Sequence, residues 1–167
     1  PEKSAGIKLL TVPTPDGKLT PELIDVQAWG WGDEHRAQPL VVSITQSTEL
    51  GTLYTPGEIR ALADQGVAVS VDTMRASVAA AAVEAGAAVI NDVSGGLADP
   101  QMPALVAESG APFVVMHWRA HSATMQNLAE YDDVVTDVLA ELDGRVRALV
   151  GAGVDPARLV LDPGIGF

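Results

Sequence analysis

Four apolar runs that each stop on polar residues constrain the fold of this chain more than any other feature. They read VAVSVDTMR, AAVINDVSGG, PFVVMHWRA and RLVLDPGIGF, at residues 67–75, 87–96, 112–120 and 158–167. A strand covered by helices on both faces of its sheet reads as a continuous Val/Ile/Leu run. Helix-like segments separate the runs, so the chain predicts an α/β fold with a parallel sheet and right-handed crossovers.

Five strands are expected, because a further apolar run, LVVSIT, lies upstream of the other four. A helix at 55–66 follows it, with Thr55 as N-cap, Pro56 in the first helical position and Gly66 at its C-terminal end. From there on strands and helices alternate, and the apolar residues near 133–150 recur at helical spacing. The predicted strands lie near 40–45, 67–72, 87–91, 113–117 and 158–162.

Charge and composition exclude several classes of function. The formal net charge is −12, the pI is about 4.4 and no basic cluster occurs, so nucleic acid and anionic membranes are poor partners. The absence of cysteine excludes a thiolate metal site, a disulfide framework and a thiol nucleophile. Neither a membrane-spanning apolar run nor a signal-peptide pattern is found, so we expect a cytoplasmic location. The sequence begins on Pro1 without Met, and we expect it to be a piece of a longer protein.

Polar side chains follow the last four predicted strands. Asp72, Asn91, His117 and Asp162 stand at the strand ends, where parallel α/β folds place their binding sites. Each also has an ordinary structural explanation: a helix cap for Asp72, a turn for Asn91 and Asp162, and a packed core position for His117. Helix capping does not require a polar residue after every strand, so the recurrence favours one shared binding site. The sequence assigns neither a catalytic residue nor a metal ligand.

The motifs VSVDTMR, INDVSGG, VVMHWRA and LVLDPGIGF, in this order, resemble the middle of the dihydropteroate synthases, the pterin-binding TIM-barrel enzymes of folate biosynthesis. The resemblance extends over about residues 61–167. It implies a partial (β/α) TIM-type barrel, since 167 residues are fewer than the about 250 of a closed one. It also implies a transferase that condenses 6-hydroxymethyl-7,8-dihydropterin diphosphate with 4-aminobenzoate and releases diphosphate, with Mg²⁺ assisting the leaving group.

The same resemblance implies a set of pterin-binding positions. Asp72, Asn91 and Asp162 correspond to the polar residues of the family's pterin pocket. Its lining corresponds to three further positions, Val93, Met116 and Phe167. The chemistry agrees, because a pterin presents a flat edge of N–H donors beside one carbonyl. A carboxylate accepts two parallel N–H bonds from such an edge, and the carboxamide of Asn91 donates and accepts at once.

Residues 1–60 lack the motifs with which a dihydropteroate synthase should open. The segments GIKLLTVPTPDGKLTPELIDV and PLVVSITQSTELGTLYTPGEIRALAD instead resemble an internal piece of a low-specificity threonine aldolase, a family that uses pyridoxal phosphate. None of the three lysines, Lys3, Lys8 and Lys18, stands in the context of that family's cofactor-binding lysine. We therefore expect a chimeric fragment with two parts, a foreign N-terminal α/β segment at 1–60 and a pterin-binding domain at 61–167.

The family's later cationic residues and the residues of its Mg²⁺ site are absent from this chain. Arg75 and Arg119 are the only cations near the strand ends, so weak turnover or none is expected. A non-catalytic pterin-binding fragment and a methyltetrahydrofolate-binding methyltransferase domain remain alternatives. A pyridoxal-phosphate aldolase is disfavoured, because its catalytic lysine is missing. Half a barrel leaves two open sheet edges, which favour pairing with another chain, so a homodimer is a further expectation.

Overall fold

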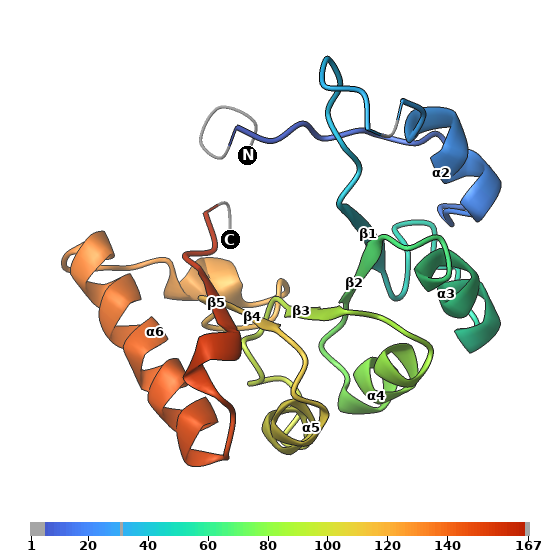
Figure 1. The fold of residues 1–167 in the computed structure, drawn as a ribbon. Helices are drawn as coiled ribbons and strands as arrows, with labels where there is room; N and C mark the ends of the chain where they lie inside the picture. The colour runs from blue at the N-terminus through green and yellow to red at the C-terminus, as the bar shows by residue number, and fades with distance from the viewer. Residues whose placement is uncertain (1–5, 31, 166–167) are drawn as a thin grey trace.

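Five parallel strands form one sheet in the computed structural model, which describes residues 6–30 and 32–165 (Figure 1). The strands stand in the sheet in the order of the sequence. Their bounds are Val41–Thr45 (β1), Ala68–Asp72 (β2), Val89–Asp92 (β3), Phe113–Met116 (β4) and Leu159–Asp162 (β5). All five predicted strands are confirmed, and their ends differ by at most two residues from those expected.

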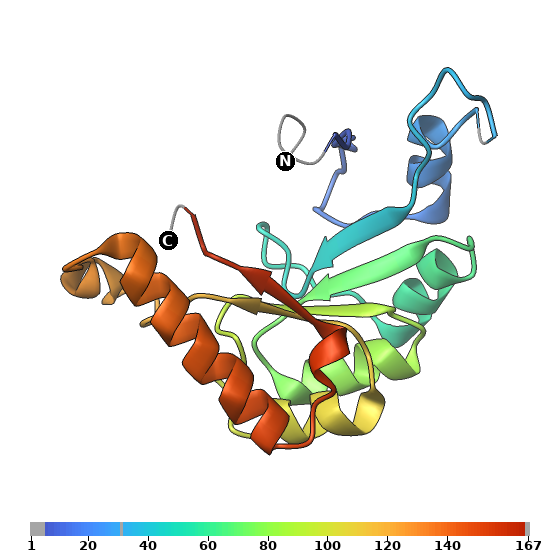
Figure 2. The same ribbon diagram turned by 60° about the vertical axis from the view of Figure 1, so that its left-hand side comes forward.

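Each connection between neighbouring strands carries a helix. The helices α3 to α6 lie on the convex side of the curved sheet, and no helix lies against its concave side in the described part of the chain (Figures 1 and 2). The helices are α2 (Pro21–Gln27), α3 (Pro56–Ala63), α4 (Ala76–Glu84), α5 (Met102–Ser109) and α6 (Val134–Gly151), with 3₁₀ turns at Met125–Leu128 and Pro156–Arg158. An open, curved parallel sheet with outer helices is the arrangement of a partial TIM-type barrel.

The helix ends follow from local sequence. Thr55 begins α3 with a capping box, in which its hydroxyl accepts the Glu58 amide and the Glu58 carboxylate accepts the Thr55 amide at 2.7 Å. Asp133 caps α6 by accepting the Thr136 amide at 2.8 Å. Gly110 ends α5 with φ of 64°, the left-handed conformation that glycine adopts without strain. No helix of the described residues is both long and apolar enough to cross a bilayer.

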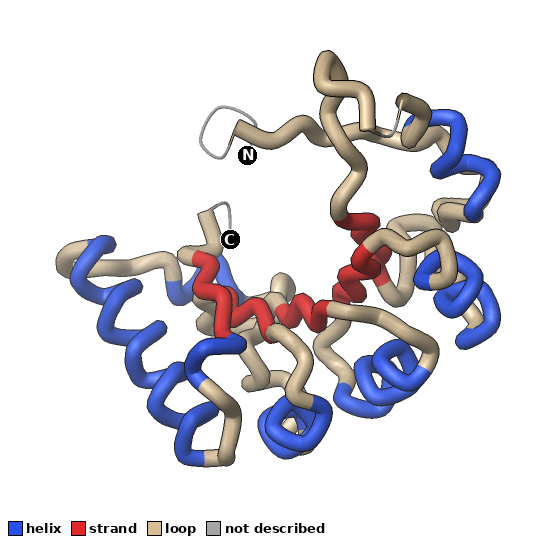
Figure 3. Tube along the Cα trace, viewed as in Figure 1, coloured by secondary structure: helices blue, strands red, loops and turns tan. Residues whose placement is uncertain are grey.

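Side chains along the strands alternate between a buried and an open environment. Those that face the helices form the core, and their largest members are fully buried: Val69, Val71, Ile90, Phe113 and Val115. The residues between them, such as Ser70 and Asn91, face the concave side and are only partly buried. Val41 and Val160, on the two edge strands, remain 59% and 53% exposed. Figure 3 shows the result, an arc of strands with helices outside and an open inner face.

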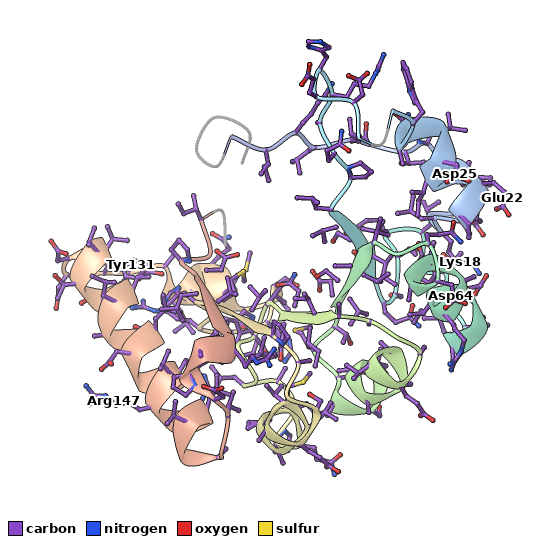
Figure 4. The ribbon with its side chains drawn as sticks, viewed as in Figure 1. Lys18, Glu22, Asp25, Asp64, Tyr131 and Arg147 are labelled. Carbon is purple, nitrogen blue, oxygen red and sulfur yellow. The ribbon has the colours of Figure 1, made fainter. Side chains whose placement is uncertain are left out.

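The N-terminal part of the chain joins the same sheet. β1 pairs in parallel with β2 along its whole length, and α3 forms the crossover between them. Ile24 of α2 is buried in the core cluster on this side, and the Leu19 amide donates to the Tyr54 hydroxyl at 2.6 Å. Lys18 lies beside α3 and pairs with Glu58 (Figure 4). The division of the chain near residue 60 stays a prediction, because a shared sheet is compatible with either origin of the segment.

Candidate functional site

Asp72 and Asn91 meet at the carboxyl ends of neighbouring strands. They stand opposite each other in the register of β2 and β3, and the Asn91 carboxamide donates to the Asp72 carboxylate at 2.8 Å. Because each side chain alternates with buried residues that face the helices, both lie on the concave side of the sheet. The structure therefore brings together two of the residues that the sequence assigned to one site.

The strand register shows which residues of β4 and β5 share the face of Asp72 and Asn91. Asn91 stands opposite Val114, and Val114 opposite Val160. Met116 and Asp162 lie two residues further along β4 and β5 and are themselves opposite each other. Since the side-chain period of a strand is two, these positions share the face of Asp72. Asp72 and Asp162 thus lie on one face, as the sequence predicts. They are three strand spacings apart across the sheet and two residues apart along the strands, which together give a separation of about 16 Å.

The other predicted positions differ in accessibility. Val93 directly follows β3 and is partly buried. Met116 is 4% exposed, so its side chain is packed among its neighbours at the strand ends. One oxygen of Asp162 accepts the Gly164 amide at 2.8 Å, which closes a turn after β5. Phe167 lies outside the described residues.

Asp92, which the sequence alone did not single out, is the most buried carboxylate of this region. It points to the helix side of β3, is 0% exposed, and accepts both the Ser94 amide and hydroxyl and the Gly96 amide, at 2.7–3.0 Å. Burial raises the pKa of Asp92, and these hydrogen bonds together with Arg145 oppose the rise. Its carboxylate fixes the SGG turn that follows Asn91. The strand period could have shown that Asp92 and Asn91 face opposite sides.

His117 does not join the strand-end site, so the expectation that it shares this site with Asp72 and Asp162 is wrong. It is 7% exposed, and its ring bonds the Glu141 carboxylate on α6 at 2.8 Å. Arg119 binds the same carboxylate through two nitrogens and stacks on the Tyr131 ring at 3.9 Å. Arg119 chiefly, and His117 in addition, lower the pKa of Glu141. This cluster holds the loop after β4 against α6.

The electrostatics of the strand ends are predominantly acidic. Burial raises the pKa of Asp72, the Asn91 hydrogen bond opposes the rise, and the charges of Asp92 and Glu49 add to it. Arg119 has its charge balanced by Glu141. Arg75, at the start of α4, is exposed and makes no ion pair among the described residues.

The described residues contain no group of three or more acidic or histidine side chains that could hold one ion. These residues therefore offer no ligand set that would hold a Mg²⁺ ion through protein side chains alone, and we assign no step to the ion. A shallow cavity lies under the loop after β4, lined by residues such as Trp118, Leu128 and Tyr131, and none of its lining residues is Asp72, Asn91 or Asp162. The candidate site is an open face of the sheet.

Comparison with known sequences shows which protein family this chain matches. The profile of the pterin binding enzymes matches residues 47–167. The dihydropteroate synthase of Mycobacterium leprae is 54% identical over 110 residues, which are 65% of this chain and 39% of that protein. A mitochondrial folate synthesis bifunctional protein of Arabidopsis thaliana is 39% identical over 150 residues, 87% of this chain and 26% of the relative. The chain thus spans well under half the length of these relatives.

Solved structures give the same answer for the fold. The dihydropteroate synthase of Thermus thermophilus in complex with 6HMPPP is 39% identical with a TM-score of 0.68, and the match covers 78% of this chain and 51% of that one. The same enzyme in complex with 4-aminobenzoate gives a TM-score of 0.66 at 38% identity. The match to these enzymes bears out the partial-barrel fold expected from the sequence. The resemblance of residues 1–60 to threonine aldolase stays a prediction.

Replacing Asp72 with Asn should stabilise the protein at neutral pH. A carboxyl whose pKa is raised above its ordinary 3.8 stabilises the folded state fully below that value, and this contribution is lost as the pH rises through the folded pKa. Asp72→Asn keeps an acceptor for Asn91 and removes the buried charge. We expect a gain in unfolding free energy of about 0.5–2 kcal/mol at pH 7, measured by urea denaturation, which shrinks towards pH 4.

The matched control is Asp25→Asn, which removes an exposed carboxylate on α2 (Figure 4). It should change the unfolding free energy little at any of these pH values. A gain in unfolding free energy for Asp72→Asn that is the same at pH 4 and pH 7, or a loss at pH 7, would show that burial of the Asp72 charge does not destabilise the folded state.

Proposed function

Because the chain belongs to the family of pterin-binding enzymes, we propose that the concave face of its sheet binds a pterin ring at the ends of β2 to β5. The supporting observation is the set of acceptors on this face. Asn91 donates its amide hydrogen to Asp72, which leaves the Asn91 carbonyl oxygen and the second Asp72 oxygen to accept. The Asp162 carboxylate has one oxygen engaged with the Gly164 amide and keeps further accepting capacity.

A pterin ring is matched to this arrangement. Its flat edge carries several N–H donors, and parallel N–H groups bind a carboxylate in bidentate geometry. The separation of about 16 Å between Asp72 and Asp162 along the sheet leaves room for a bicyclic ring between them. Val93 and Met116 lie at the same strand ends and contribute apolar contacts to the ring. Phe167 completes this proposed set from outside the described residues.

The reaction that we propose for this site is that of a dihydropteroate synthase. The C–O bond between the exocyclic carbon of 6-hydroxymethyl-7,8-dihydropterin diphosphate and the diphosphate breaks, and diphosphate leaves with the bonding electrons. The amine nitrogen of 4-aminobenzoate forms the new bond to that carbon and loses one proton to the solvent. The names of the relatives support this activity, and the acidic strand ends favour positive charge that develops on the pterin as the C–O bond breaks. The small molecules expected as partners are therefore a pterin and 4-aminobenzoate.

The cationic part of the catalytic machinery is incomplete in the described residues. Departing diphosphate requires positive groups that contact it more strongly in the transition state than before it. Arg119 is committed to Glu141, which leaves Arg75 as the one arginine at these strand ends without an ion pair in the described residues. This observation favours a second candidate function, a pterin-binding fragment without turnover. From the family we also infer that the activity depends on Mg²⁺ and that the protein is cytoplasmic.

We also propose that two copies of the chain associate through β5. This strand has no outer neighbour among the described strands, and Val160 and Leu161 are each 53% exposed. An unpaired strand edge with apolar side chains on both faces favours pairing with another chain. Light scattering should report a dimer that Leu161→Lys converts to a monomer. A monomeric parent chain would contradict this proposal.

Pterin binding can be tested with Asp→Asn substitutions of equal charge change. Asp162→Asn should weaken the binding of 6-hydroxymethylpterin about 10- to 100-fold, because a hydrogen bond to a charged acceptor is worth about 1.5–3 kcal/mol. Asn91→Ala should weaken it as well. The fluorescence of the pterin measures the affinity. Asp143→Asn, an exposed position on α6, is the control and should bind like the parent chain. Equal affinity of all variants would remove Asp162 and Asn91 from the site.

Turnover should be weak even where the ring binds. Loss of one electrostatic donor costs about 10²–10³ in rate, so we expect a rate at least about 100-fold below that of a complete synthase. The assay combines the chain with pterin diphosphate, labelled 4-aminobenzoate and Mg²⁺, and the M. leprae enzyme serves as the reference. Dihydropteroate formed at the reference rate would show that the described residues already carry the chemistry.

A further inference from the structure

Two glycine turns close on the end of β4 from opposite sides. Gly95, in the turn after β3, has φ of +59°, and a Cβ atom there would lie 2.9 Å from the Met116 carbonyl oxygen. Gly164, in the turn after β5, has φ of +68°, and its Cβ would lie 2.7 Å from the His117 carbonyl oxygen and 3.4 Å from Cγ of Met116. Backbone atoms cannot yield as a flexible side chain can, so only glycine fits at either position.

Each turn is held firmly in this place. The Gly95 amide donates to the Asp92 carbonyl at 2.9 Å, and Arg145 on α6 donates to the Gly95 carbonyl at 2.6 Å from the outer side. On the other side, the Gly164 amide donates to the Asp162 carboxylate at 2.8 Å. The His117 amide donates to the Asp162 carbonyl, also at 2.8 Å. The last residues of β4 therefore have little room to shift between the two turns.

We propose that Gly95 and Gly164 are positioning residues that determine how far the Met116 side chain lies from a ligand at the strand-end site. This inference rests on the proposed function, because it makes Met116 the apolar contact of the pterin ring. Met116 is 4% exposed, and the two turns determine where its side chain packs. A side chain at either glycine pushes the end of β4 away and changes how far Met116 stands from the ring.

A third glycine separates close approach from backbone strain. Gly110 has φ of +64°, nearly that of Gly95, yet a Cβ there would have no heavy atom within 4 Å. Alanine at Gly110 therefore carries the cost of a left-handed backbone without displacing a neighbour. A difference between Gly95→Ala or Gly164→Ala and Gly110→Ala reports the contact with β4 and not the conformation of the glycine.

The position of Met116 can be followed without a ligand. The chain has four methionines, so labelling with ¹³C at the methyl group gives a simple NMR spectrum in which Met116→Leu identifies the Met116 signal. We expect Gly95→Ala and Gly164→Ala to shift this signal, and Gly110→Ala to leave it in place. An unchanged Met116 signal in the folded variants, or an equal shift in Gly110→Ala, overturns the proposal.

Two further measurements keep the outcomes distinct. Pterin affinity should fall about tenfold in Gly95→Ala and Gly164→Ala and stay unchanged in Gly110→Ala. If the parent chain binds no pterin while the Met116 signal still shifts, the proposed function fails and the positioning role stands. If neither alanine variant folds, Arg145→Met decides, because it releases the Gly95 carbonyl without adding atoms to the turn. A shift of the Met116 signal then supports the proposal, and its absence overturns it.

Discussion

The parallel register of β2 and β3 is the constraint on which the rest of the site depends. It places Asp72 opposite Asn91, and the period of the strands then determines which residues of β4 and β5 share their face. A slip of one residue would turn Asp72 towards the helices and bring Val71 to the open face. The full burial of Val69, Val71 and Ile90 under the helices excludes that slip. The apolar core thus selects the register, and the register assembles the polar face.

Two carboxylates at this end of the sheet differ in how far hydrogen bonds compensate for their burial. Asp92 is fully buried but bonds the SGG turn through several donors, so its burial is compensated and the turn is fixed. Asp72 accepts a hydrogen bond from one side chain among the described residues, that of Asn91, and burial raises its pKa. A partly compensated acceptor at a strand end works against stability and is suited to a ligand that brings N–H donors. Hydrogen-bond acceptors that remain available to a ligand therefore lie on the open face, beside the SGG turn that Asp92 fixes.

Much of the fold could be predicted, because apolar runs such as that of 67–72, separated by helical segments, indicate the strands of a parallel sheet. Cover by helices on both faces, which such runs also indicate, is not found in the described residues, where the helices lie on the convex side alone and the strand residues alternate in burial (Figures 1 and 2). The placement of Asp72 and Asn91 followed from the rule that polar strand ends share one edge. His117 was misplaced, because the next residue of a strand faces the other side and its partner, Glu141, lies 24 positions away in the sequence. The approach of Gly164 to the end of β4 was also beyond sequence reasoning, since only packing brings the two turns together.

The most direct test of this account is a structure of the chain with 6-hydroxymethyl-7,8-dihydropterin bound. We expect the ring to lie on the concave face, with its N–H edge within hydrogen-bonding distance of the Asn91 carbonyl oxygen and the Asp162 carboxylate, and with Met116 against its plane. A ring bound instead in the cavity under the loop after β4, beside Trp118 and Tyr131, would contradict it. In that case the polar strand ends would be turns and caps, and not the ligand site.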